Sequence, residues 1–251
     1  MARVLSNETS LSRQQKRMRS ETKALRYVMW GEAGLAALLA MVGVASVLRG
    51  AGTGWFWAAA VAGFFAYSHF MKLRQNARDE KYMAAGLRGE SEVAKILTEN
   101  LDNSHYLYND ITVRSGFARA QIDHIVVSKK GIFVLETKNW RGRLEGDEGD
   151  RKWFQHVHAD QPPRALSNPI LQNQRHVVVL EKYLRSSGAP PMPIVPILVF
   201  TGRNTTLDIR NQKSLLLWPR ETVDAILRHR VENDATEADV DAVLNRMQRF
   251  V

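Results

Sequence analysis

The chain has 251 residues, 45% of them hydrophobic, which is enough for one sizeable core or for one domain with appendages. It contains no cysteine, which excludes a disulfide framework and a cysteine-ligated zinc site and fits a reducing compartment. The formal net charge is +9, but residues 84–251 hold 23 Lys and Arg against 21 Asp and Glu. The positive excess therefore lies mostly before residue 84 and is weak evidence for nucleic-acid binding.

Two apolar runs, residues 27–48 and 55–71, stand on either side of the glycine-rich turn RGAGTG. A helix needs roughly 20 apolar residues to cross a bilayer core, with about 17 as the lower limit. Both runs meet this length, and both are rich in small residues, as packed membrane helices are. The pattern predicts a transmembrane helical hairpin over 27–71. The alternative is a helical hairpin buried in a soluble protein, and Glu32, near the start of the first run, is the residue that fits a membrane least well.

The basic residues predict the orientation of this hairpin. Residues 1–26 form a polar, basic N-terminus with seven Lys and Arg against two acids, and the polar connector 72–83 has four against two. Only Arg49 lies in the turn. By the positive-inside rule, both termini and the globular part are expected in the cytoplasm, at the cell (inner) membrane. The hairpin is also a candidate surface for homo-oligomerisation.

The globular part begins at residue 84 with a helical pattern over 84–101, in which Glu90 lies on the otherwise apolar face. Asn168 followed by Pro169 predicts the start of a later helix. Residues 202–251 are expected to be a helical extension, with Thr236 as a helix cap. Four strand-like runs are 105–113, 121–128, 131–139 and 193–201, and 143–157 is a candidate edge hairpin. This order predicts an α/β domain with a mixed central sheet flanked by helices.

Three charges stand inside the apolar run QIDHIVVSKKGIFVLETK. Glu136 and Lys138 share one face of their strand because side chains alternate. If Lys129 and Lys130 form a two-residue turn, Asp123 lies directly opposite Glu136. Gly131 leaves open a three-residue turn, which would put Asp123 on the other face unless a bulge restores it.

Two adjacent carboxylates repel each other, and a divalent cation removes that repulsion. Oxygen ligands suit Mg²⁺, which can lower the pKa of a bound water and stabilise charge on a phosphate. Lys138 would then stabilise developing negative charge, and Glu90 is a candidate additional ligand or base. The alternative is an exposed edge hairpin with an ordinary Glu–Lys pair.

The stretch QIDHIVVSKKGIFVLETKN, the G-x-x-G-E pattern that ends at Glu90, the later Trp153 and the N-P-x-x-Q pattern over 168–172 resemble the NERD domain (nuclease-related domain). The resemblance covers about residues 84–201. NERD is placed in the PD-(D/E)xK nuclease superfamily, which implies a mixed sheet flanked by helices (a restriction-endonuclease-like fold) with a metal site on two neighbouring strands. Ile122 replaces the proline of the superfamily's name.

The resemblance implies a role for each matching residue. Asp123 and Glu136 would bind Mg²⁺ or Mn²⁺ and Lys138 would be the catalytic lysine. Glu90 would match the acidic residue of the first helix, and Gln172 a polar residue on the later helix that supports the site. The resemblance does not by itself imply turnover, because nuclease-like folds can lose activity.

Other residues leave alternatives open. His124 is interpreted as a packed or hydrogen-bonding histidine, whereas His176, four residues after Gln172, either faces the site or does not. Trp140 is a core or rim residue that could stack on a base, and Arg141 and Arg143 are either phosphate contacts or solvated rim charges. Our hypothesis is a membrane-anchored, metal-dependent nuclease that acts on DNA, such as incoming foreign DNA. The rival is a non-catalytic module that binds nucleic acid or a protein at the membrane.

Overall fold

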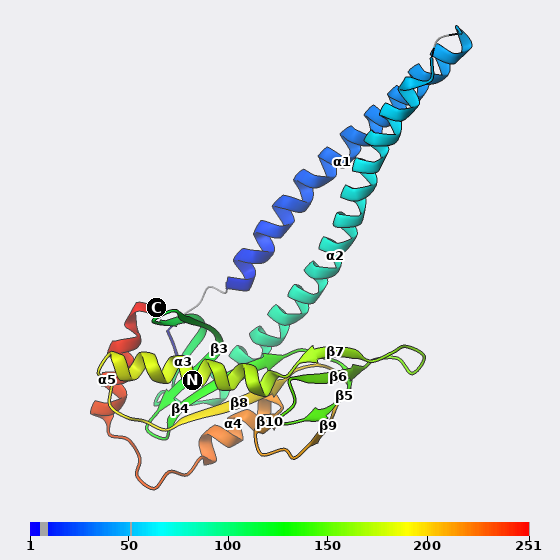
Figure 1. Cartoon of the computed structure of the whole chain (residues 1–251). Coiled ribbons are helices and arrows are strands. Elements are labelled where there is room, and N and C mark those ends of the chain that lie inside the picture. Colours follow the sequence, from blue (N-terminus) through cyan, green and yellow to red (C-terminus); the bar gives the residue numbers. More distant parts are fainter. Residues whose placement is uncertain (6–9, 51, 251) are drawn as a thin grey trace. The chain divides into compact units, whose positions relative to one another are not determined.

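The computed structural model describes residues 1–5, 10–50 and 52–250, with the side chains of 10–15 left out (Figure 1). The chain divides into two compact units. One consists of Met1–Thr9 and Ala85–Val251, and the other is Ser10–Ala84. Each unit is described by itself.

The unit Ser10–Ala84 consists of helix α1 (Ser10–Leu48) and the first part of helix α2 (Gly54–Asn100). Three polar contacts join the two helices in antiparallel order. Arg19 Nε lies 2.6 Å from Glu80 Oε1, and His69 Nδ1 lies 2.6 Å from Glu32 Oε2. Asn76 Nδ2 donates to Thr22 Oγ1 at 3.3 Å. The large apolar side chains of both helices, including Trp30, Leu38, Met41, Trp57, Phe64 and Phe65, are exposed.

Among the described helices, one segment is long and apolar enough to cross a membrane: Lys16–Leu48 of α1, whose most apolar stretch of 18 residues is 6% buried. The apolar run 55–71 of α2 is not, because Trp, Tyr, Ser and His residues lower its hydropathy. Of the two expected spanning helices, the structure therefore shows two long packed helices, of which one has the composition of a span. Helix α2 continues without a break through the expected connector 72–83 into the other unit.

The central sheet of the larger unit is mixed and has the strand order β1-β2-β3-β4-β8-β10. Strands β2, β3 and β4 pair antiparallel, whereas β1 with β2, β4 with β8, and β8 with β10 pair parallel. This is the mixed sheet that the sequence predicts. The strands are β1 (Arg3–Val4), β2 (Tyr106–Ser115), β3 (Ala118–Ser128), β4 (Gly131–Lys138), β8 (Ile194–Phe200) and β10 (Leu215–Leu217).

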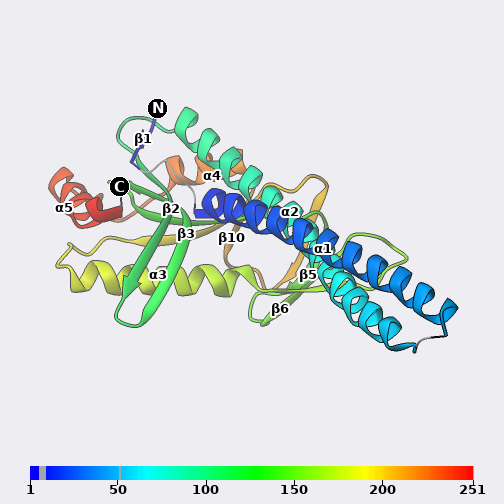
Figure 2. The same ribbon diagram turned by 90° about the horizontal axis from the view of Figure 1, so that it is seen from above.

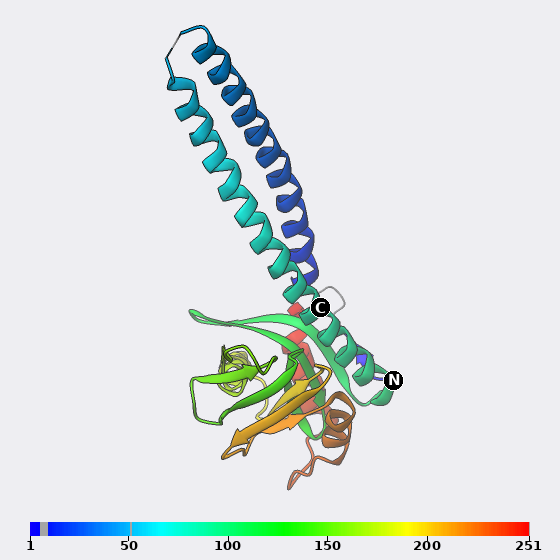
Figure 3. The same cartoon turned by 90° about the vertical axis from the view of Figure 1, so that its right-hand side faces the viewer.

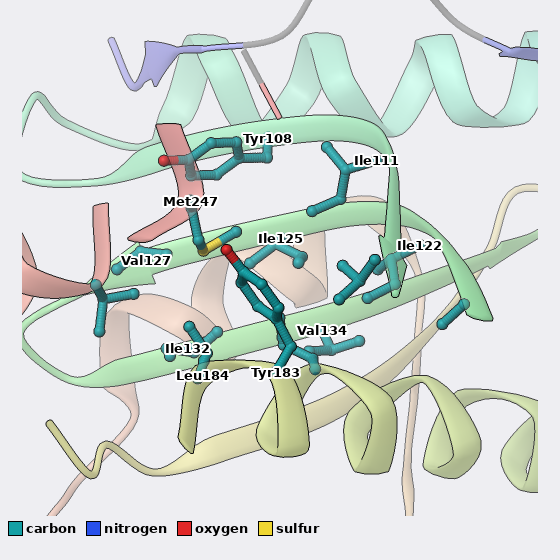
Figure 4. Packing of buried hydrophobic residues seen from close by; sticks show 14 of the residues in the cluster. Tyr108, Ile111, Ile122, Ile125, Val127, Ile132, Val134, Tyr183, Leu184 and Met247 are labelled. Carbon is teal, nitrogen blue, oxygen red and sulfur yellow. The ribbon is translucent and has the colours of Figure 1, made fainter. Parts of the chain in front are cut away.

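Helices cover both faces of this sheet (Figures 1 and 2). On one face, the end of α2 and α4 (Pro219–Arg228) pack through Val93, Leu97 and Val223 against Phe133 and Leu135. On the other face lie α3 (Pro169–Ser186) and α5 (Glu237–Met247), followed by the short helix η1 (Gln248–Phe250). Figure 4 shows this second core, in which Tyr183, Leu184 and Met247 meet side chains of β2, β3 and β4. The three-layer arrangement is held by burial of both sheet faces.

A second sheet has the order β7-β6-β5-β9. The predicted hairpin over 143–157 forms its centre rather than an edge of the main sheet. Trp153 is fully buried here, and its Nε1 donates to the Asp147 carbonyl at 2.9 Å. A Cβ at Gly146 would lie 2.4 Å from the Trp153 ring, so only glycine leaves room for it. The strands are β5 (Gly142–Asp147), β6 (Lys152–His156), β7 (Arg164–Ser167) and β9 (Thr205–Arg210).

Several local predictions are confirmed. Asn168 caps α3, its side chain accepting from the Ile170 amide at 2.8 Å, and Pro169 is the first helical residue. Thr236 caps α5 in a capping box with Asp239. Residues 202–251 contain two strands, β9 and β10, in addition to the expected helices.

The first residues of the chain join the larger unit. Strand β1 pairs with β2, matching Arg3 with Tyr106 and Val4 with Leu107. The Ala2 amide donates to the Thr98 carbonyl at 3.0 Å, and the Ala2 side chain is buried in the core under α2. The extreme N-terminus is therefore part of the same sheet as the domain that follows the two long helices.

Candidate active site

The turn between β3 and β4 sets the register of the site. Ser128 pairs with Gly131, so Lys129 and Lys130 form the two-residue turn, and Gly131 has a φ of 127°. The pairing ends at His124 with Leu135, so Asp123 and Glu136 are the next residues beyond the last pair of the ladder. The Thr137 amide donates to Asp123 Oδ2 at 2.7 Å, so this carboxylate closes the end of the ladder. Of the two turns that the sequence allows, the two-residue turn is the one formed.

Four polar side chains converge on the end of β4. Lys138 Nζ donates to Glu136 Oε1 and, at 3.2 Å, to Gln172 Oε1 on α3. His176 Nδ1, one turn further along α3, lies 3.2 Å from Glu136 Oε2. Both oxygens of the buried Glu136 carboxylate therefore face a basic side chain. His176, which the sequence left open, faces the site.

Asn173 fixes the helix that carries Gln172 and His176. Its buried Nδ2 donates to the Val134 carbonyl of β4 at 3.1 Å and to the Ile197 carbonyl of β8 at 3.0 Å. These two bonds set the position of α3 along β4. Sequence reasoning missed this residue, although a polar residue between two site residues on one helix is a signal.

Glu90 is brought to the site by a close approach of α2 to the strand ends. A Cβ at Gly89 would lie 2.5 Å from Thr201 Oγ1 and 3.0 Å from Asn139 Cβ, so glycine is required there. Asn139 Nδ2 also donates to the Ala85 carbonyl at 2.6 Å. At Gly86, the first glycine of the G-x-x-G-E pattern, no atoms lie within 4 Å of the Cβ position.

The carboxylates of the site shift one another's pKa values. Burial, and then the charges of Asp110 and Glu136, raise the pKa of Glu90 to about 7. Burial, and then the charges of Glu136 and Glu90, raise the pKa of Asp123 well above its usual range. Burial also acts to raise the pKa of Glu136, but Lys138 and His176 outweigh it and hold that pKa below its usual value. The site thus has one stably ionised carboxylate beside two that are costly to ionise without a cation.

Asp110 is a site residue that sequence reasoning missed. The β2–β3 register sets it opposite Asp123, and its backbone is left-handed, with a φ of 50°. Such a conformation is uncommon for a residue other than glycine, and strained backbone of this kind gathers at functional sites. Gln121 Nε2 donates to Asp110 Oδ1 at 2.8 Å. In the sequence, the signal for this residue was an acid within the strand-like run 105–113, HYLYNDITV.

The donor set suits a hard divalent cation held by few protein ligands. Among the described residues, no three His, Asp or Glu side chains are close enough together to form a metal-binding cluster. The expected use of Glu90 as a ligand beside Asp123 and Glu136 stays a prediction. Mg²⁺ commonly uses only one or two carboxylates and keeps several waters. The pair Asp123 and Glu136 fits that requirement, with Glu90 near enough to interact electrostatically.

The remaining candidates lie outside the reacting centre. His124 is buried and bonds to Asn109 Oδ1 at 2.8 Å, and burial lowers its pKa to about 4. Arg143 pairs with Glu145 and Asp208 at the rim. Trp140 packs against the core of the second sheet, with Lys138 Nζ 5.6 Å from its ring centre.

Glu90→Gln is expected to stabilise the metal-free protein at pH 8 by up to about 3 kcal/mol. A pKa raised to about 7 means that the folded protein holds the proton more tightly than the unfolded chain. The stability that the protonated Glu90 contributes is therefore complete below the unfolded pKa near 4.5 and is lost as the pH rises through about 7. Urea denaturation in EDTA at pH 5 and pH 8 measures this. An equal pH dependence in both proteins would contradict the placement of Glu90.

Comparison with known proteins agrees with this geometry in the part of the chain that contains it. Residues 85–201, which include all the site residues named here, match the family described as nuclease-related domain (NERD). An uncharacterized protein of Bacillus anthracis is 34% identical over 97 residues, which are 38% of this chain and 45% of that protein. The chain thus spans less than half of the length of that relative. No solved structure matches the chain.

Proposed function

We propose that the chain is a metal-dependent nuclease that hydrolyses phosphodiester bonds, with DNA as the favoured substrate. The observation that carries the proposal is the group formed by Asp123, Glu136 and Lys138, in which the two acids stand next to the last paired residues of β3 and β4 and the lysine contacts Glu136. The similarity of residues 85–201 to the nuclease-related domain supports the same reaction class.

Each side chain has a role that follows from its contacts. Asp123 and Glu136 would hold Mg²⁺ or Mn²⁺, which when bound supplies charge neutralisation and an acidified water. Lys138, held between Glu136 and Gln172, would stabilise the negative charge that develops on the phosphate. Glu90, with its pKa near 7, is poised to accept a proton at neutral pH.

Membrane attachment is the second part of the proposal. The exposed apolar side chains of α1 and α2 form a surface of the kind that is covered by lipid or by another copy of the chain. Strand β1 supports two crossings rather than one. Because Arg3 and Val4 pair with β2, the N-terminus and the domain lie on the same side of any membrane, and the segment between them crosses an even number of times.

The basic residues that flank the two helices support a cytoplasmic domain at the cell (inner) membrane. A nuclease in that position would meet nucleic acid that enters the cell. The exposed apolar surface also favours association of the hairpin with other copies of the chain, which would give a homo-oligomer.

Lys138→Ala is expected to lower the cleavage rate by about 10²–10³-fold, because it removes the cation that faces the developing charge. The full-length protein in detergent is incubated with linear, circular and single-stranded DNA and with RNA, in Mg²⁺, Mn²⁺ or EDTA. Lys182→Ala, an exposed lysine of α3, is the matched control. Cleavage that survives in EDTA, or that is equal in Lys138→Ala and the wild type, would contradict the proposal.

A non-catalytic binding module is the second candidate. The observation that favours it is that Lys138 and His176 contact the two oxygens of Glu136, which makes a self-neutralised cluster. This candidate predicts that each substrate of the same panel is bound but not cleaved, whether Mg²⁺ or Mn²⁺ is present.

A further inference from the structure

The β2–β3 hairpin has an exposed tip with two arginines and one aromatic residue. Its turn, Gly116 and Phe117, stands beyond the other strands of the sheet (Figures 2 and 3). Gly116 has a φ of 57°, as a tight hairpin turn requires. The turn makes no such demand on Phe117, whose side chain is fully exposed. The phenyl ring is therefore explained neither by the turn nor by the core.

The two arginines are placed where they weaken the hairpin. Arg114 pairs directly with Arg119 across the strands, and both are exposed. Like charges directly opposite each other destabilise a strand pair. Within the described part of the chain, neither arginine forms an ion pair. A partner that carries negative charge would relieve this repulsion.

Polar residues of the hairpin lie between these arginines and the acids of the site. Thr112 and Gln121 pair on the same face of the hairpin, two residues inward from the arginines. Gln121 Nε2 then bonds to Asp110, which the register sets opposite Asp123. Phe117 is six residues from Asp123 along β3, or about 20 Å at the rise of a strand. That distance equals about six base pairs of duplex DNA.

We propose that Arg114, Phe117 and Arg119 form a nucleic-acid contact that holds the duplex about six base pairs from the scissile phosphate. The inference rests on the proposed function, since it takes nucleic acid as the substrate. The arginines bind backbone phosphates, and the phenyl ring packs against bases or sugars. A lipid surface also attracts arginine and phenylalanine, but the row of polar residues between the tip and the acids favours nucleic acid.

Binding is measured in EDTA, where no turnover is needed, so that a failure of catalysis does not affect the result. The full-length protein in detergent is titrated with a labelled 20-base-pair duplex at several salt concentrations. Arg114→Gln with Arg119→Gln is expected to reduce the slope of log affinity against log salt by about 2. Phe117→Ala is expected to weaken binding roughly tenfold. Lys138→Ala should change neither quantity by as much.

Arg228→Gln with Arg230→Gln removes the same charge from the exposed end of α4 and just beyond it, and serves as the matched control. Unchanged binding by the tip variants, or an equal loss in the control, would overturn the inference, even if metal-dependent cleavage is found. Absence of duplex binding by the wild type would overturn it as well.

The lack of cysteine allows a second readout. Phe117→Cys introduces a single thiol, to which an environment-sensitive fluorophore is attached in the full-length protein in lipid nanodiscs. An emission change on addition of duplex supports the contact with nucleic acid. Quenching by a lipid-soluble quencher with no response to duplex would assign the tip to the membrane surface and overturn the proposal.

Discussion

Replacing Glu136 by glutamine is expected to lower metal-dependent cleavage by more than about a thousandfold. The substitution keeps the size of the side chain and removes the charge that faces the Lys138 ammonium and would bind the cation. Although burial acts to raise the pKa of Glu136, Lys138 and His176 hold it below its usual value. The effect is measured as the single-turnover rate on plasmid DNA at saturating Mg²⁺.

Glu181→Gln is the control for this experiment, because Glu181 is an exposed acid on α3 that pairs only with Arg185 among the described residues. It should cleave at the wild-type rate. A Glu136→Gln protein that keeps its circular dichroism spectrum and cleaves within tenfold of the wild type would remove Glu136 from the site.

Trp153→Ala is expected to lower the free energy of unfolding by about 3–5 kcal/mol. Trp153 is fully buried, fills the space that Gly146 leaves, and donates its indole N–H to the Asp147 carbonyl. Removing it leaves a cavity and takes one of two hydrogen bonds from the Asp147 carbonyl, which also accepts from the Asp150 amide. Urea denaturation followed by fluorescence should show a lower midpoint with an unchanged slope.

Trp218→Ala is the comparison, since Trp218 is 37% exposed and its side chain makes no hydrogen bond at the α4 cap. Its cost should be well below that of Trp153→Ala. Equal and small effects of the two substitutions would mean that the second sheet is not held by its tryptophan.

The parts of the fold that local sequence determines could be predicted. The sequence narrowed the turn between β3 and β4 to two lengths, of which the two-residue turn at Lys129 and Lys130 is formed. The caps at Asn168 and Thr236 located α3 and α5, because each cap bonds within its own helix. These features depend on residues that are neighbours along the chain.

The parts that depend on distant pairing could not be predicted. Strand β1 has two residues and pairs with a strand about a hundred positions later. Strand β9 joins β5 across the chain and draws residues after 201 into the second sheet. The presence of Asp110 and Asn173 at the site depends on the β2–β3 register and on the docking of α3. The sequence shows both residues as polar positions within an apolar pattern, but it does not show the distant pairing that brings them to the site.

The case for a membrane-spanning role rests on different evidence for each of the two long helices. By composition, α1 alone has the character of a membrane span, because the aromatic and polar residues of α2 lower its hydropathy. If the chain enters a membrane, the pairing of β1 with β2 requires it to return to the side on which it began. The proposal that the second helix also spans therefore rests on connectivity rather than on its residues.

Calorimetric titration of the full-length protein with Mn²⁺ tests the central claim most directly, because it requires no knowledge of the substrate. The account predicts that the wild type binds Mn²⁺, and that a folded Asp123→Asn, Glu136→Gln double variant has lost this binding. Equal Mn²⁺ binding by both proteins, or none by the wild type, would contradict a metal site formed by Asp123 and Glu136.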